Sequence, residues 1–139
     1  MSRVNRRRFL KSTSTLAAGA GLGYFSSRSL GRSQSVNERP CFALIGCGGQ
    51  GTGDARRALA FGDMAVACDV DSAHSAYVQD IFTKRLGREG KKANIETCED
   101  YRAVIDRDDI DAIICGTVDH WHVKIAAEAL KSGKDVYCE

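Results

Sequence analysis

Short apolar runs alternate with amphipathic segments along the chain from residue 41 onward. Strands are expected at residues 41–45, 64–68, 95–98, 111–116 and 135–139, and helices at residues 54–61, 72–86, 101–105 and 123–130. Most of the expected strands are short apolar runs without alternating polar positions, which is typical of strands covered on both faces in a parallel sheet. With right-handed crossovers, the pattern predicts an α/β fold with a doubly wound parallel sheet of strand order 3-2-1-4-5.

A basic segment precedes the first apolar run. Residues 5–11, Asn-Arg-Arg-Arg-Phe-Leu-Lys, look like a twin-arginine export signal, and a short apolar stretch at residues 16–25 follows them. That stretch is shorter than the roughly 20 apolar residues of a membrane-spanning helix, so no permanent membrane anchor is expected. We interpret residues 1–35 as a twin-arginine signal peptide and linker, with a disordered basic tail as the alternative. This predicts recognition by the twin-arginine export machinery and a periplasmic or otherwise exported protein.

Charge is divided unevenly between this leader and the rest of the chain. Seven of the 20 basic residues lie in residues 1–35, which contain no Asp or Glu, so residues 36–139 hold 13 basic and all 18 acidic residues. The net charge of residues 36–139 is therefore −5, although the whole chain carries +2. An acidic domain is a poor partner for phosphate backbones, so nucleic-acid binding is not expected.

The chain contains six cysteines, and their positions favour free thiols over disulfides. Cys41, Cys68, Cys115 and Cys138 lie in or at the ends of apolar runs that we interpret as buried strands, where cysteine packs as a small hydrophobe. Cys47 lies inside a glycine-rich turn. The absence of a Cys-x-x-Cys motif weakens zinc and iron–sulfur interpretations. Folding before export would also take place under reducing conditions.

The glycine-rich turn between the first expected strand and helix is the strongest candidate site. Gly46, Gly48 and Gly51 form a Gly-x-Gly-x-x-Gly motif in the strand-to-helix context that dinucleotide binding requires. The first glycine permits the tight turn, the second lets a pyrophosphate approach the backbone, and the third lets the helix pack against the sheet. The start of the helix offers its N–H groups and its dipole to phosphates. The residues predicted to bind the cofactor here are Gly46, Cys47, Gly48, Gly49, Gln50 and Gly51.

Asp69 ends the second expected strand and supplies the second half of the dinucleotide signature. A carboxylate at this position can accept hydrogen bonds from the adenosine ribose hydroxyls. A 2′-phosphate would meet the same carboxylate at close range, so NAD is favoured over NADP. The alternative interpretation of Asp69 is a cap at the end of the strand.

The segment 116–122, Gly-Thr-Val-Asp-His-Trp-His, follows the fourth expected strand at the edge of the sheet where such folds bind ligands. Its His-x-His pair would need a third ligand to hold zinc, and His74 lies in a different expected helix, so no metal site is predicted. The segment either lines the nicotinamide end of the cleft or merely starts a helix, with Asp119 as N-cap and Trp121 at the cleft rim.

These motifs together resemble the Gfo/Idh/MocA oxidoreductases, the family of glucose–fructose oxidoreductase, inositol dehydrogenase and the rhizopine catabolism protein. The resemblance covers residues 40–139 and is carried by residues 45–51, 68–71, 109–114, 119–122 and 129–139. It implies a Rossmann-type NAD-binding domain at residues 36–139. Outside the glycine turn, the cofactor-binding residues that we predict are Asp69, Thr117, His120, His122 and Glu139.

The chain departs from the family pattern at two places. Val118 replaces a proline that usually follows the fourth strand, which leaves that loop less constrained. The sequence ends at Glu139, where the family usually continues with Lys-Pro and then a second domain that carries substrate and acid–base groups. The domain is therefore expected to be truncated, no residue of the chain is predicted to be catalytic, and the chain alone is expected to be inactive.

The resemblance implies an exported NAD-dependent oxidoreductase that transfers hydride between the nicotinamide and a sugar, cyclitol or similar polyol. One alternative is an NAD-dependent glycosidase of the same fold, which uses the cofactor as a temporary hydride store. Another is a truncated, non-catalytic product that at most binds nucleotide. A methyltransferase that uses the glycine turn for S-adenosylmethionine is disfavoured by the later segments. Family members often form dimers or tetramers, so the full-length protein is a candidate homo-oligomer.

Overall fold

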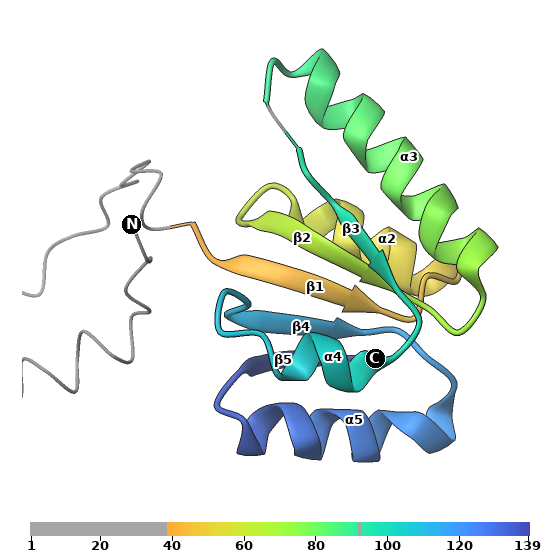
Figure 1. Cartoon of the computed structure of the whole chain (residues 1–139), viewed down its shortest axis with the longest axis vertical. Helices are drawn as coiled ribbons and strands as arrows, with labels where there is room; N and C mark the ends of the chain where they lie inside the picture. The colour runs from red at the N-terminus through yellow and green to blue at the C-terminus, as the bar shows by residue number, and fades with distance from the viewer. Residues whose placement is uncertain (1–38, 92) are drawn as a thin grey trace, which may run out of the picture. The chain divides into compact units, whose positions relative to one another are not determined.

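Five parallel strands form the centre of the computed structural model, which describes residues 39–91 and 93–139. The strands are β1 (Cys41–Ile45), β2 (Asp63–Cys68), β3 (Glu96–Cys98), β4 (Ala112–Cys115) and β5 (Asp135–Cys138). Their order is β3-β2-β1-β4-β5, and every neighbouring pair is parallel (Figure 1). The predicted fold class and strand order are confirmed. The predicted signal peptide and linker at residues 1–35 lie outside the described residues.

Four helices cover the two faces of this sheet. They are α2 (Gly49–Ala58), α3 (Ser72–Arg88), α4 (Tyr101–Ile105) and α5 (Asp119–Lys131). Successive residues of a strand point to opposite faces, and β1 shows the consequence. Phe42 and Leu44 pack in a cluster with α2 and α3, whereas Ala43 and Ile45 pack in a cluster with α4 and α5. This two-sided cover explains why the central strands β1 and β4 are apolar throughout, whereas the edge strands β3 and β5 also carry exposed polar residues.

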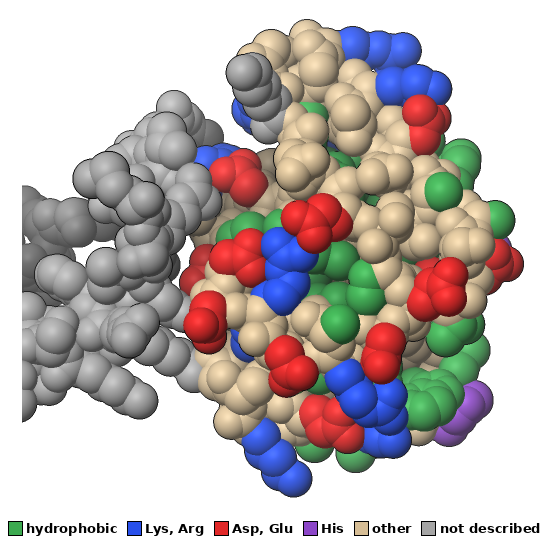
Figure 2. Space-filling view, in the orientation of Figure 1, with side chains coloured by type: hydrophobic (Ala, Val, Ile, Leu, Met, Phe, Trp, Pro, Cys, Tyr) green, Lys and Arg blue, Asp and Glu red, His purple; other side chains and the backbone are tan. Residues whose placement is uncertain are grey.

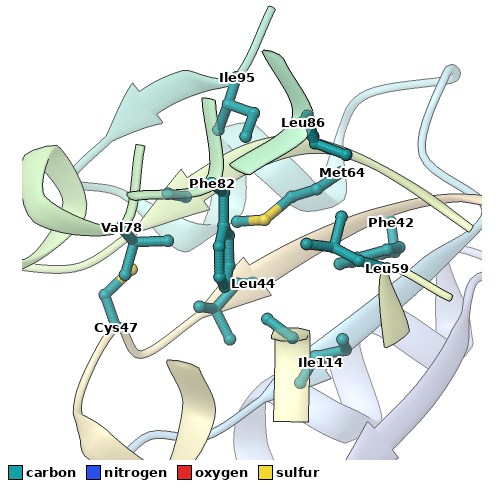
Figure 3. Packing of buried hydrophobic residues seen from close by; sticks show 12 residues of the cluster. Phe42, Leu44, Cys47, Leu59, Met64, Val78, Phe82, Leu86, Ile95 and Ile114 are labelled. Atoms are coloured by element: carbon teal, nitrogen blue, oxygen red, sulfur yellow. The ribbon is translucent and has the colours of Figure 1, made fainter. Parts of the chain in front are cut away.

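The two buried phenylalanines of the described residues, Phe42 and Phe82, lie on the face covered by α2 and α3. Figure 3 shows Phe82 of α3 among Leu44, Met64 and other members of this cluster. Phe82 is 1% exposed and Leu44 is fully buried. Truncation of such a side chain to alanine typically costs ~3–5 kcal/mol for Phe and ~2–5 kcal/mol for Leu. Cys47 of the glycine turn belongs to the same cluster, so this core anchors the turn.

Two helices begin earlier than the sequence pattern predicts. We expected them at residues 54 and 123, but α2 begins at Gly49 and α5 begins at Asp119. The first residues of α2 are glycines or polar residues, and those of α5 include the polar Asp119, His120 and His122, which contribute little to an apolar face. First-turn N–H groups need no intrahelical partner, so such residues are tolerated there. Asp119 also places its negative charge at the positive end of the α5 dipole.

Cys138 does not lie in a buried strand as expected, because β5 is the edge strand of the described sheet. The side chain of Cys138 is exposed, as is that of Tyr137, which is 56% exposed. Cys41 is half-buried, while Cys47, Cys68 and Cys115 are buried. The burial prediction therefore fails at the edge strand.

The surface of the unit from Arg39 to Glu139 mixes both signs of charge. Figure 2 shows acidic and basic side chains interspersed over the face toward the viewer. Several of them pair locally, as Arg107 does with Glu96 and Asp109 at 2.6 and 2.8 Å. Among the helices that the structure describes, none combines the length and the apolar character needed to cross a bilayer.

Candidate nucleotide-binding site

The turn between β1 and α2 exposes the amino terminus of α2. Gly46 leaves β1 with a φ of 92°, in the left-handed region that favours glycine. Its N–H donates to the carbonyl of Cys68 over 2.8 Å, which ties the turn to the end of β2. Gly48 is the N-cap of α2, and no side chain caps the helix there. A helix start of this kind presents N–H groups and the positive end of its dipole to a phosphate.

Three glycines pack backbone against backbone beneath this turn. A Cβ added to Gly51 would lie 2.2 Å from the carbonyl oxygen of Gly46. One added to Gly116, just after β4, would lie 2.5 Å from the Cα of Gly51. One added to Gly46 would lie 2.6 Å from the carbonyl carbon of Gly116. We call Gly46, Gly51 and Gly116 the glycine contact, and it brings the turn, α2 and the end of β4 together.

Other glycines of the turn face open space instead. A Cβ added to Gly48 or Gly49 would meet nothing within 4 Å. Gly48 lines a cavity of about 510 Å³ at the carboxyl ends of the strands, together with Gly46. The turn therefore has glycine both where the backbone packs closely and where a ligand can approach the backbone. This arrangement fits a bound pyrophosphate.

Asp69 directly follows β2 and lines the same cavity as Gly46 and Gly48. One carboxylate oxygen accepts from the N–H of Cys47 at 2.7 Å, and the other accepts from the N–H of Asp71 at 2.9 Å. A carboxylate has about four acceptor positions, so these two bonds orient the group and leave about two for a ligand. The side chain of Asp69 is 13% exposed. It is thus a fixed, partly desolvated acceptor, which suits the hydroxyl pair of a ribose.

Aromatic side chains form the wall of the cavity on the side of α4 and α5. Tyr101 and Trp121 both line it, with their ring centroids 6.1 Å apart in an edge-to-face arrangement. The Tyr101 hydroxyl donates to a carboxylate oxygen of Glu128 at 2.9 Å, which joins α4 to α5. The exposed side chain of Val70 contributes a further apolar surface. Such surfaces suit a flat heterocyclic base.

The structure brings some of the predicted site residues together and separates others. Gly46, Gly48, Asp69 and Thr117 line the cavity. Gly51 is buried in the glycine contact, and the Cys47 side chain belongs to the hydrophobic cluster of Figure 3. Gly49 and Gln50 begin α2 on the surface, and the Gln50 amide contacts the Glu139 carboxylate. His120 and His122 lie in the first turn of α5 and are not among the lining residues of this cavity.

The interpretation of Asp119 as the N-cap of α5 is wrong. The N-cap is Val118, which has an extended backbone and makes no side-chain cap, and Asp119 is the first helical residue. Val118 occupies the position where the family usually has proline. Trp121 lines the cavity, in agreement with its predicted place at the cleft rim.

The thiols around the turn are held in the neutral state. Burial and, to a smaller extent, the Asp69 carboxylate raise the pKa of the Cys47 thiol to about 12. Burial and the neighbouring Cys98 also raise the pKa of the Cys68 thiol. A neutral thiol is a poor nucleophile, so these cysteines pack rather than react. The described cavity therefore has the chemistry of a binding site.

Sequence reasoning missed several residues of the cavity, among them Val70, Tyr101 and Arg102. A signal for part of this set exists, because residues 99–102 directly follow β3 and the carboxyl ends of parallel strands meet at one edge. Nothing in the sequence distinguishes Val70 from other exposed apolar residues.

A family model described as the Gfo/Idh/MocA oxidoreductase family, NAD-binding Rossmann fold, matches residues 41–139. The chain therefore belongs to this family, and the matched residues are its NAD-binding Rossmann domain. The resemblance inferred from the motifs is confirmed, and so is NAD as the cofactor.

The chain is similar to a glycosyl hydrolase family 109 protein of Shewanella pealeana, with 26% identity over 99% of this chain and 33% of the relative. It is also similar to an inositol 2-dehydrogenase of Rubrobacter xylanophilus, with 30% identity over 74% of this chain and 27% of the relative. Among solved structures, a myo-inositol dehydrogenase of Lactobacillus casei in complex with NAD(H) and myo-inositol matches with a TM-score of 0.56 and 17% identity. That match covers 72% of this chain and 28% of the other. The chain spans about a third of the length of the curated relatives it matches.

Proposed function

We propose that the complete protein is an exported NAD-dependent oxidoreductase that acts on a sugar, cyclitol or similar polyol. The observation that carries this proposal is the joint geometry of the glycine contact and Asp69 at one cavity, in a chain of an oxidoreductase family. The Rubrobacter relative, named inositol 2-dehydrogenase, supports the substrate class.

Each part of the site has a distinct task in this proposal. The uncapped amino terminus of α2 binds the pyrophosphate, and Gly48 keeps its backbone accessible there. Asp69 accepts hydrogen bonds from the adenosine ribose, and its charge repels the 2′-phosphate of NADP. Thr117, which lines the same cavity as Gly46, is assigned to the nicotinamide end of the cofactor in this proposal.

The nicotinamide, when bound, supplies the acceptor or donor of the hydride. The reaction also needs an acid–base group, and we assign that role to none of the described residues. We propose that this group belongs to the substrate-binding part of the complete protein, where it takes the proton of the substrate hydroxyl as the hydride leaves the same carbon.

A second candidate function is hydrolysis of glycosides with retained NAD. It is favoured by the extent of similarity, since the glycosyl hydrolase family 109 relative aligns over 99% of this chain and the inositol 2-dehydrogenase over 74%. Both functions use the same nucleotide domain, so the residues of that domain do not separate them.

Export is the remaining part of the proposal, and the basic motif at residues 5–11 supports it. A reporter fused after residue 38 is expected to reach the periplasm in a host with a working twin-arginine pathway. Substitution of Arg6, Arg7 and Arg8 by lysine should retain it in the cytoplasm. Export that persists in the lysine variant would contradict this assignment.

The enzymatic alternatives are separated by two assays on the complete protein. An oxidoreductase forms NADH in proportion to the polyol consumed, which the absorbance of NADH reports. A glycosidase releases the leaving group of an aryl glycoside without net change in the cofactor. NADH formation from cyclitols or sugars supports the leading proposal, and leaving-group release without NADH formation replaces it with the second candidate. If the complete protein shows neither activity, both candidate functions are contradicted.

A further inference from the structure

A histidine and two cysteines meet beside the end of β4. Cys115 is the last residue of β4, Cys138 is the last residue of β5, and the two are register partners in the parallel pair. His122 belongs to the first turn of α5. One potential ligand atom from each residue, Sγ of the cysteines and a ring nitrogen of His122, lies within 4.8 Å of the other two. We call these three residues the Cys2His cluster.

The sequence gives no hint of this cluster. Its members are separated by 7 and 16 residues, and neither spacing belongs to a common zinc motif. The sheet creates it, because parallel register places Cys115 and Cys138 at the same level on neighbouring strands. Because α5 begins just after β4, its first turn carries His122 close to the same end of that strand. Across residues 39–91 and 93–139, no other group of three or more His, Cys, Asp or Glu side chains is arranged closely enough to hold a metal ion.

The ring of His122 is already oriented by the loop after β4. Its Nε2 lies 2.9 Å from the carbonyl oxygen of Thr117. A carbonyl can only accept, so this bond places the proton on Nε2 and the lone pair of the neutral ring on Nδ1. An imidazole fixed in this way by a backbone carbonyl is the usual state of a metal-ligating histidine.

A second cysteine pair in the same sheet provides an internal comparison. Cys68 and Cys98 are register partners on β2 and β3, with their sulfur atoms 3.7 Å apart. This pair is not part of a metal-compatible group in the described structure. The two pairs therefore share the strand geometry, but among the described residues only the pair of Cys115 and Cys138 has a histidine ring beside it.

We propose that Cys115, His122 and Cys138 bind a thiophilic divalent metal ion, for which zinc best matches the donor set. Zinc is bound by Cys sulfur and His nitrogen in tetrahedral geometry, and a set of two Cys and one His leaves a fourth position open to water or another ligand. On binding, each thiol releases its proton to solvent, so two thiolates and a neutral imidazole surround the ion. The two thiolate charges cancel the charge of the ion, and the half-buried site carries no net charge.

The burial of the three residues suits entry of the ion from solvent. Cys115 is fully buried, His122 is half-buried and Cys138 is exposed. An ion can therefore reach the cluster past Cys138 and be held against the interior by Cys115. This proposal goes beyond the proposed oxidoreductase function and does not depend on it.

Cobalt(II) is the probe, because thiolate ligation gives it a near-ultraviolet charge-transfer band and tetrahedral ligation gives it strong visible bands. The complete protein, reduced with a phosphine and freed of metal by a chelator, is titrated with Co²⁺ and then with Zn²⁺. We expect one ion per chain, both sets of bands, and their loss when zinc displaces cobalt. Absence of the charge-transfer band would overturn the proposal.

The variants assign the bands to the cluster. Cys138→Ser alters an exposed side chain and should lower the Co²⁺ affinity more than ~100-fold, since even loss of an outer-shell partner costs ~10–100-fold. His122→Gln should weaken the visible bands and lower the affinity. Cys98→Ser, from the second pair, is the matched control and should leave the spectrum unchanged. Equal spectra in wild type and Cys138→Ser, or equal loss in Cys98→Ser, would overturn the assignment.

Thermal unfolding provides a readout that is independent of the spectrum. Zinc should raise the Tm of the wild type and of Cys98→Ser but not that of Cys138→Ser, whose metal-free Tm should match the wild type. Mass spectrometry of the protein before reduction tests the competing chemistry. A Cys115–Cys138 peptide pair that lacks two hydrogens would identify a disulfide and overturn the metal site.

Discussion

Replacement of Gly51 by alanine is expected to destabilise the domain severely through the glycine contact. The added methyl carbon would lie 2.2 Å from the carbonyl oxygen of Gly46 and 3.3 Å from the Cα of Gly116. Real Cβ atoms essentially never approach another heavy atom within 3.0 Å. Both neighbours are backbone atoms, so no rotamer change relieves the contact. The turn, α2 and the end of β4 would have to separate.

The expected cost follows from the rigidity of these neighbours. Overpacking of a core by added methylenes typically costs ~1–3 kcal/mol when side chains can adjust. Backbone cannot adjust in that way, so Gly51→Ala should lose at least ~3 kcal/mol. For a domain of this size, such a loss lowers Tm by ~12–24 °C. Urea unfolding followed by far-ultraviolet circular dichroism measures the loss directly.

Two other glycines of the same segment provide matched controls. A Cβ at Gly53 or at Gly48 would meet nothing within 4 Å. Gly53 lies inside α2, so Gly53→Ala should stabilise the protein by ~0.5–1 kcal/mol through the helix preference of alanine. Gly48→Ala should cost at most ~1 kcal/mol of stability, because alanine is a poorer N-cap than glycine, but it should place a methyl group in the cavity. NAD affinity should then fall about tenfold or more, which corresponds to ~1.4 kcal/mol.

The three variants therefore separate packing from ligand approach. A Gly51→Ala protein within ~0.5 kcal/mol of the wild type would refute the packing argument, because surface substitutions typically fall in that range. Gly48→Ala with full NAD affinity would refute the role of the open glycine. Equal destabilisation by Gly53→Ala would show that any side chain in α2 is disruptive.

Three further predictions concern buried polar and thiol groups. Lys134 is 6% exposed, and its ammonium donates to the carbonyls of Arg107 and Ile110. Lys134→Met should therefore lower the free energy of unfolding by at least ~1.5 kcal/mol. An unchanged midpoint of urea unfolding would contradict this. In the metal-free protein, the buried Cys47 thiol should resist iodoacetamide at pH 8 while the exposed Cys138 reacts, as peptide mapping can show. The pKa of Cys47 rises from 9.0 to about 12 on folding, so its contribution to stability is complete below pH 9 and is lost as pH rises toward 12. Cys47→Ala should therefore lose less stability than the wild type as the pH rises from 9 to 12. In the iodoacetamide experiment, equal labelling of Cys47 and Cys138 would contradict the burial of the turn.

The sheet could be predicted because its central strands β1, β2 and β4 are largely buried on both faces. Runs such as residues 41–45 and 111–116 carry no polar alternation, and this pattern together with the intervening helices leaves few topologies. The starts of α2 and α5 could not be located in the same way. Gly49 and Asp119 have low helix propensity, and their helical state depends on the adjoining turn rather than on an apolar face. Exposure of Cys138 depends on which strand is at the edge, and the composition of β5 does not encode this.

The residues of the candidate site also divide into those that the sequence predicts and those that depend on tertiary packing. The glycines and Asp69 could be predicted because a phosphate-binding turn and a ribose acceptor impose residue types at fixed places in a strand-turn-helix unit. Tyr101 and Trp121 form the opposite wall only because α4 and α5 pack together over one face of the sheet. The Cys2His cluster depends on strand register, which a single sequence does not specify.

The most direct test of the account is calorimetric titration of the wild type and of Asp69→Ala with NAD and with NADP. The Asp69 carboxylate is fixed by two backbone N–H groups and retains acceptor positions for the ribose. Hydrogen bonds to a charged group are worth ~1.5–3 kcal/mol, so Asp69→Ala should lose ~10–150-fold in NAD affinity. The wild type should prefer NAD, and the ratio of NAD to NADP affinity should fall sharply in the variant, which a merely structural defect would not cause. Equal affinity of the wild type for the two nucleotides, or an unchanged ratio in Asp69→Ala, would contradict the account.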